Sequence, residues 1–255
     1  MGLRTNLYER TTYLNKDIDY LFNIDIREYD LRDAGFSIIK QYGLLPADKI
    51  DYLSKMDKTN RKIEIGMLRK YNKTFSDNLS KGFIEARKTF FSANDLTDDD
   101  ILSVKNDAIF VIKKHCQGQF GELDFRIKNE YLGYLYLNRI EFYYSALKDT
   151  VDIKGIDNDL VELHKEYMID FFKDLFSMKI YSERKVFVKF LTDFIKAYRR
   201  LDLELGYYRE LSQESFYSIY LDGEKSLIKD IDSDEGLDIT YNYFKYLVPI
   251  ASIFI

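Results

Sequence analysis

The chain has 255 residues, of which 46% are hydrophobic and 32% charged, and its formal net charge is −5. This composition is typical of a folded protein with a sizeable core, and it excludes a disordered chain or one that coats nucleic acid through bulk positive charge. Cys116 is the only cysteine, which excludes an intramolecular disulfide, and no apolar stretch is long enough to cross a membrane. We therefore expect a cytoplasmic protein with no membrane partner.

The first informative segment reads as a strand, an acid and a helix. Ile24–Asp30, IDIREYD, alternates apolar and charged residues, which indicates a half-buried strand that Asp30 closes. In Leu31–Tyr42 the apolar residues recur at helical spacing, and Gly43 follows as an end signal.

Three further helices are expected next. Pro46–Met56 starts with a proline that a first helical turn tolerates. The second, TNRKIEIGMLRKYNK, can be capped by Thr59 or Asn60, and it presents a dense basic surface that includes Arg61, Lys62 and Arg69. The third is Asn78–Ala93.

The stretch ILSVKNDAIFVIKK predicts a β-hairpin. Ile101–Val104 and Ala108–Ile112 are short apolar runs, and the polar residues between them favour a tight turn. The turn places Asp107 at the tip of the hairpin, where it is either a simple turn residue or a functional carboxylate.

Beyond the hairpin, Leu123–Lys128 and Tyr131–Leu137 read as strands, while Ile140–Leu147 fits either a strand or a helix. Val151–Ile156 contains a glycine near its end, and Asp157 or Asn158 can cap the next helix. The chain then becomes helical, over Leu160–Met178 and Ser182–Leu211, and its aromatic residues are interpreted as core. The expected fold class is α+β, with a small antiparallel sheet packed by helices and a mostly helical C-terminal half. We expect an α+β region at 1–156 and a helical region at 157–255, which could form a single domain.

Asp30 and Asp107 are the candidate catalytic and metal-binding residues. If their strands are neighbours in one antiparallel sheet, the two carboxylates converge. Such oxygens suit Mg²⁺ or Mn²⁺, and two ions about 4 Å apart can assist an in-line phosphoryl transfer. A shift of register by one residue would move this role to a flanking acid among Asp25, Glu28 and Asp33.

At this point the order of motifs resembles the palm and fingers of family A DNA polymerases and the related single-subunit RNA polymerases. YDLRDAG is similar to their first motif, RKIEIG has the spacing of their fingers helix, and VKNDAIFVI is similar to their metal-binding hairpin. The resemblance covers Ile24–Ile112. The chain departs from the pattern at Ile65, Asn106 and Ala108, where that family carries an aromatic residue, a histidine and often an acid.

The resemblance implies that Asp30 and Asp107 bind two metal ions, and that Arg61 and Lys62 contact the phosphates of an incoming nucleotide. Arg69 would lie further along the same face. We therefore expect a nucleotidyltransferase that adds nucleotides to a 3′-hydroxyl.

Two alternatives stay open: a non-enzymatic interaction protein or degenerate polymerase subunit, and a two-metal nuclease. Expected partners are nucleic acid, nucleoside triphosphates, and other replication or transcription proteins. The free use of Lys, Asn, Asp, Ile and Tyr indicates an AT-rich coding sequence, and bacteriophage origin would place the protein in the host cytoplasm.

Overall fold

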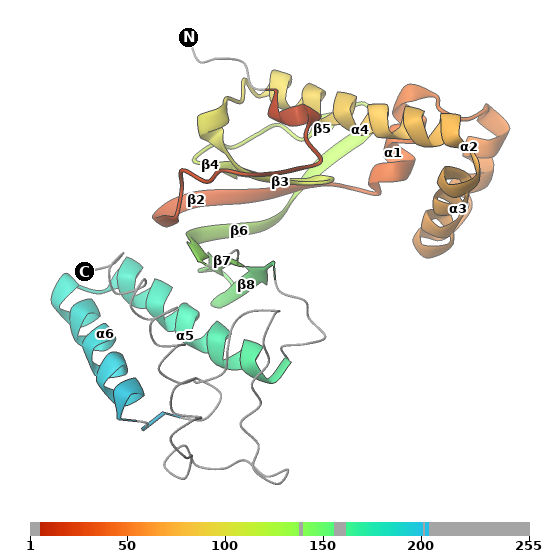
Figure 1. Cartoon of the computed structure of the whole chain (residues 1–255). Coiled ribbons are helices and arrows are strands. Elements are labelled where there is room, and N and C mark those ends of the chain that lie inside the picture. The colour runs from red at the N-terminus through yellow and green to blue at the C-terminus, as the bar shows by residue number, and fades with distance from the viewer. Residues whose placement is uncertain (1–5, 138–139, 156–161, 201, 204–255) are drawn as a thin grey trace, which may run out of the picture. The chain divides into compact units, whose positions relative to one another are not determined.

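A computed structural model describes residues 6–137, 140–155, 162–200 and 202–203 (Figure 1). The chain forms two compact units, each made of two chain segments. The first unit contains Met1–Ile18 and Ile24–Glu130, and the second contains Asp19–Asn23 and Tyr131–Ile255. Helices and antiparallel strands occur together, which confirms the predicted α+β class. The predicted division near residue 156 stays a prediction, because residues 156–161 lie outside the described part.

The sheet of the first unit has the strand order β1-β3-β4-β2-β6. Its strands are β1 (Thr12–Leu14), β2 (Tyr20–Leu31), β3 (Ile101–Lys105), β4 (Ala108–Ile112) and β6 (Leu123–Leu137), and the short β5 (Gln119–Phe120) pairs with β6. The β3–β4 hairpin is confirmed, and Asn106 adopts a left-handed φ of 55° in its turn. As the metal-site hypothesis requires, β2 and β4 are antiparallel neighbours.

Residues of this sheet and of four helices form the core of the first unit, and the row of helices extends beyond the end of the sheet (Figure 1). The helices are α1 (Ala34–Tyr42), α2 (Ala47–Ser54), α3 (Lys58–Tyr71) and α4 (Lys73–Ala93), with two 3-10 turns, η1 (Leu7–Glu9) and η2 (Asp98–Asp100). From β2, Tyr29 and Leu31 enter the core. Because strand side chains alternate, Glu28 and Asp30 lie on the other face.

Local sequence explains where two of these helices begin. Helix α3 starts before Thr59, because the Asp57 carboxylate accepts hydrogen bonds from the backbone N–H groups of Thr59 and Asn60. Helix α1 starts at Ala34 rather than Leu31, because β2 continues through Leu31 and Asp33 takes a left-handed conformation with φ 49°.

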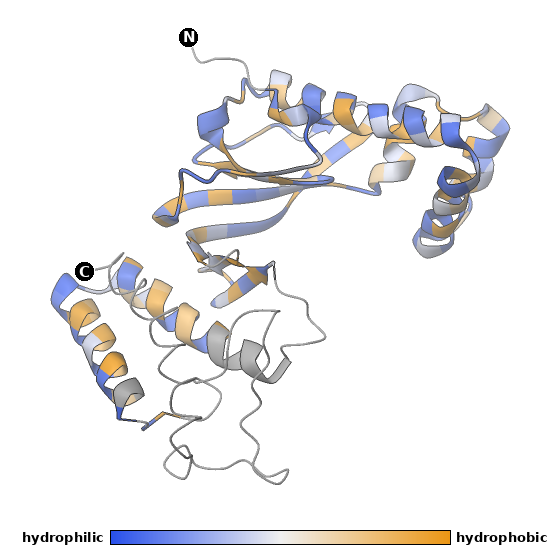
Figure 2. Ribbon diagram, in the orientation of Figure 1, coloured by the Kyte–Doolittle hydropathy of each residue, from blue (hydrophilic) through white to orange (hydrophobic). Residues whose placement is uncertain are grey.

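The second unit combines strands with an aromatic core. The end of β6 pairs with β7 (Ile140–Ser145), and β7 pairs with β8 (Thr150–Lys154), both antiparallel. Helices α5 (Glu162–Tyr181) and α6 (Arg184–Arg199) follow, and banded apolar and polar residues are visible along α6 (Figure 2). Phe142 stacks on Phe172 with ring centroids 3.8 Å apart.

Several predicted boundaries differ from the observed ones. The two strands expected between residues 123 and 137 are one continuous strand, β6, and Ile140–Leu147 resolves as the strand β7. The helix expected to reach Leu211 is described only as far as Arg199, and residues 204–255 lie outside the described part. Within the described residues, no helix has both the length and the apolarity needed to cross a membrane.

Close packing between α1 and α4 depends on Gly82, and this provides a test of the fold. A Cβ atom at Gly82 would overlap Cγ2 of the buried Ile38, whereas a Cβ at Gly66 of α3 would meet nothing within 4 Å. We expect Gly82→Ala to lower the free energy of unfolding by about 1–3 kcal/mol and Gly66→Ala to raise it by about 0.5–1 kcal/mol. Urea denaturation of both variants would measure this, and equal effects would contradict the packing.

Candidate active site

A pocket of about 720 Å³ opens in the first unit where β2 ends. Its walls come from the hairpin turn, the start of α1, one face of α3, part of α4, and β6. Charged side chains of both signs line it: Asp30, Asp33, Lys58, Lys62, Arg69, Arg87, Asp107, Arg126 and Lys128. Four of the five predicted site residues, Asp30, Asp107, Lys62 and Arg69, therefore line one pocket.

The two acids meet because β2 and β4 pair in a particular register. Asp30 stands opposite Ala108, and the backbone N–H of Leu31 donates to the carbonyl of Asp107 at 3.1 Å. Burial raises the pKa of Asp30; the Lys128 ammonium opposes this rise, and the negative charge of Asp107 adds to it. The negative charge of Asp107 thus acts on Asp30 within the same pocket, and a bound cation would offset both charges.

Lys128 supplies a cation on the β6 side of the pocket. Its Nζ lies 3.4 Å from Oε1 of Glu28 and 3.8 Å from Oδ1 of Asp30. Glu28 is buried, and its Oε2 accepts a 2.7 Å hydrogen bond from the side-chain amide of Asn129. These two acids raise the pKa of Lys128 against the lowering effect of burial.

Helix α3 provides the opposite, basic wall. Lys58, Lys62 and Arg69 all line the pocket, and the first two are one helical turn apart. Sequence reasoning missed Lys58, although its spacing from Lys62 is a usable signal. It also missed Arg126 and Lys128, whose two-residue spacing on a strand places them on one face.

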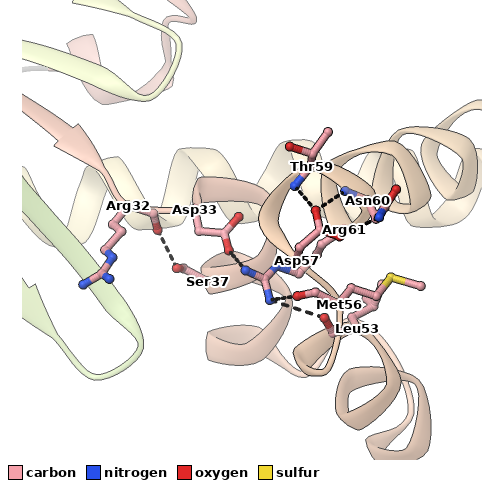
Figure 3. A network of polar contacts seen from close by, with 9 residues as sticks. All are labelled: Arg32, Asp33, Ser37, Leu53, Met56, Asp57, Thr59, Asn60 and Arg61. Atoms are coloured by element: carbon pink, nitrogen blue, oxygen red, sulfur yellow. Dashed lines mark hydrogen bonds and ion pairs between the residues drawn. The ribbon is translucent and has the colours of Figure 1, made fainter.

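Arg61, the fifth predicted residue, is not among the pocket-lining residues and holds helices together instead. Its guanidinium pairs with the Asp33 carboxylate at 2.6 Å and donates to the carbonyls of Leu53 and Met56, both at 3.3 Å (Figure 3). It also lies over the ring of Phe36, 4.6 Å from its centroid. Arg61 thereby joins the start of α1 to the segment between α2 and α3, and it supports the basic wall indirectly.

Arg87, from α4, anchors the hairpin turn next to Asp107. Its Nε donates to the carbonyl of Tyr8 at 2.7 Å, and Nη1 donates to the carbonyl of Asn106 at 3.1 Å. The side chain is buried, which lowers its pKa, and among the described residues its Nη2 has no hydrogen-bond partner. The same turn is held on its other side, where the Asn106 N–H donates to the carbonyl of Thr11 at 2.7 Å.

Asp30 and Asp107 are the two carboxylates that the sequence predicts as Mg²⁺ ligands, and both line the pocket. No group of three or more His, Cys, Asp or Glu side chains suited to a metal ion occurs in the described ranges. Mg²⁺ is nevertheless commonly held by one or two carboxylates together with water and substrate phosphates. Asp30 and Asp107 are compatible with that pattern, since both carboxylates line one pocket together with cations that suit phosphate groups.

Comparison with known proteins identifies the family. A family model described as "Bacteriophage PBS1 gene 130 protein" matches residues 1–247, and the chain belongs to that family. This membership supports the predicted bacteriophage origin. No curated protein matches the chain.

Among solved structures, the chain is weakly similar to the family B DNA polymerase from the hyperthermophilic archaeon Pyrobaculum calidifontis. The TM-score is 0.41 and the sequence identity 12%, over 89% of this chain and 44% of the polymerase chain. This chain therefore spans less than half the length of that polymerase. The resemblance to family A polymerases suggested by the sequence stays a prediction.

The different roles of two arginines on α3 can be tested by truncation. Arg61→Ala would leave the half-buried Asp33 carboxylate without its partner, so we expect it to lower the free energy of unfolding by about 2–4 kcal/mol. Arg69→Ala removes an exposed side chain and should change stability by less than about 0.5 kcal/mol. Thermal and urea unfolding would measure both, and similar losses would show that Arg61 has no special structural role.

Asp30 should reduce stability at neutral pH. Because its pKa is raised in the folded state, the folded protein holds this proton more tightly than the unfolded chain does. Stability should therefore fall as pH rises from the ordinary carboxyl pKa through the raised one. We expect Asp30→Asn to raise the free energy of unfolding at pH 7 by about 0.5–2 kcal/mol, the range common for stabilising substitutions. Near pH 3 the substitution should have little effect, because Asp30 is then protonated and uncharged. Unfolding curves recorded with a chelator would test this, and a loss of stability at pH 7 would contradict it.

Proposed function

We propose that the protein is a polymerase-type nucleotidyltransferase that adds nucleotides to a 3′-hydroxyl. The observation that carries this proposal is the single pocket lined by Asp30 and Asp107 on one side and by Lys58, Lys62 and Arg69 of α3 on the other. A site that joins a nucleotide to a 3′-hydroxyl, with release of pyrophosphate, needs hard oxygen ligands for metal beside cations that bind phosphate, and the carboxylates and basic side chains that line this pocket support such a role.

In this proposal Asp30 and Asp107 supply the carboxylate oxygens that hold Mg²⁺ or Mn²⁺. The bound metal would favour ionisation of the attacking hydroxyl and neutralise charge that develops on the phosphate. The cations of α3 would bind the nucleotide phosphates, with Lys58 and Lys62 one helical turn apart and Arg69 nearer the end of the helix. Arg61 supports that helix through Asp33, and Arg87 fixes the turn that carries Asp107.

A second candidate is a non-enzymatic subunit or interaction protein built on the same fold. One observation favours it: Lys128 already neutralises part of the charge of Glu28 and Asp30, so the acid cluster has a partner without any metal. Nucleic acid and other replication or transcription proteins would then be its partners.

The proposed activity is tested with a labelled primer on a template, deoxy- and ribonucleoside triphosphates, and Mg²⁺ or Mn²⁺. We expect the wild type to extend the primer and Asp107→Asn to lose about 100-fold or more of that rate, because the variant keeps the shape of the side chain but loses its charge. Asp99→Asn, which removes an equivalent charge from the exposed η2 turn, should retain the full rate.

Two other outcomes of this assay would exclude the proposed transferase. Primer shortening that depends on Asp107 would identify a nuclease instead. No reaction with either metal, together with no Mn²⁺ binding by calorimetry, would overturn the proposed transferase and leave the non-enzymatic candidate.

A further inference from the structure

Lys128 occupies an unusual place for a pocket lysine, because one ammonium is shared by two acids on the same strand. Its distances to Glu28 and Asp30, 3.4 and 3.8 Å, are both longer than the 2.7–2.9 Å typical of a charge-assisted hydrogen bond. The ammonium is therefore held by both carboxylates, with the shorter contact and a hydrogen bond to Glu28.

The two acids differ in how firmly they are held. Glu28 is 2% exposed and is also bound by Asn129, so it is a fixed anchor. Asp30 lies nearer the end of β2 and lines the pocket, as does Lys128, whose side chain is 48% exposed. The ammonium can thus leave Asp30 while it remains attached to Glu28.

A divalent cation at Asp30 and Asp107 would meet this ammonium directly. Like charges at such short range repel strongly when they are partly shielded from water. Binding of the metal therefore requires the lysine to withdraw toward Glu28, and the work of this displacement reduces the affinity for the metal.

We propose that Lys128 is a built-in competitor for the metal position, which lowers the affinity of the Asp30–Asp107 pair for divalent cations and withdraws onto Glu28 when a cation binds. This inference rests on the proposed function, since it assumes that the acid pair is a metal site. In this proposal Lys128 controls how tightly the metal binds, and this role is separate from the binding of phosphate groups by α3. Glu28 acquires the role of holding the displaced ammonium.

The test is a titration of the full-length protein with Mn²⁺ alone, followed by calorimetry and by water-proton relaxation, which need no catalytic turnover. We expect Lys128→Met to bind Mn²⁺ about tenfold more tightly than the wild type, whereas Lys128→Arg, which keeps the charge, should stay near the wild-type affinity. Arg126→Met is the matched control. It removes the same charge from the same strand and pocket. The Arg126 charge has a smaller influence on the pKa of Asp30 than the Lys128 charge has, and it makes no ion pair with Glu28 or Asp30 in the described residues, so the affinity of Arg126→Met should change much less.

Lys128→Gln serves as a second neutral variant that can still donate a hydrogen bond to Glu28, in case Lys128→Met fails to fold. Equal affinities in the wild type and the folded neutral variants would overturn the inference and leave the proposed metal site intact. An equal gain from Arg126→Met would also overturn it, because the effect would then reflect net charge alone. Absence of Mn²⁺ binding in every variant would overturn both the inference and the metal-dependent function.

Discussion

The antiparallel pairing of β2 with β4 is the constraint on which the rest of the first unit depends. It sets Asp30 opposite Ala108, and so brings the end of one strand beside the turn of a distant hairpin. Because side chains alternate between the two faces of β2, Tyr29 and Leu31 enter the helix-covered core, whereas Glu28 and Asp30 lie on the opposite face, which carries charged side chains. A slip of one residue would exchange these faces and place carboxylates in the core.

Charge placement around the pocket follows from this geometry. Burying acids is costly unless cations offset them, and the structure supplies cations from three different elements. Arg61 is held through Nη1 and Nη2 by the Asp33 carboxylate and two backbone carbonyls, while its buried Nε has no hydrogen-bond partner among the described residues, so it contributes stability and positioning. Lys128 is only loosely held, so it contributes adjustable charge. The pKa of Asp30 is raised chiefly by burial, which means that the surrounding cations do not fully offset the cost of burying its charge.

The sequence predicts the strand that contains Asp30 and the hairpin correctly because their signals are local. Alternation over Ile24–Asp30 and the turn at Asn106 need no knowledge of distant partners. The different positions of Arg61 and Lys62, of which only Lys62 lines the pocket, could not be predicted in the same way. Neighbouring residues on a helix point about 100° apart, and which of them faces the pocket depends on how α3 packs against α1.

Long-range pairing also limits prediction on β6. Lys128 follows the hairpin closely in sequence, yet its partners Glu28 and Asp30 lie about 100 residues earlier, and pairing at such separation leaves no local pattern. Arg126 and Lys128 therefore read as ordinary strand charges until the strand order is known. The same holds for Arg87, whose two carbonyl partners lie on separate segments, η1 and the hairpin turn.

The order of the strands along the chain has a consequence for biosynthesis. During translation β2 leaves the ribosome about 80 residues before the hairpin that pairs with it, and at typical rates this delay lasts for several seconds. Through that interval a long strand containing Ile26, Tyr29 and Leu31 has no β4 to cover its hydrogen-bonding edge. The nascent chain therefore passes through a stage that is prone to aggregation, and the charged residues Asp25, Arg27 and Glu28 within the strand would favour its solubility until β4 is synthesised.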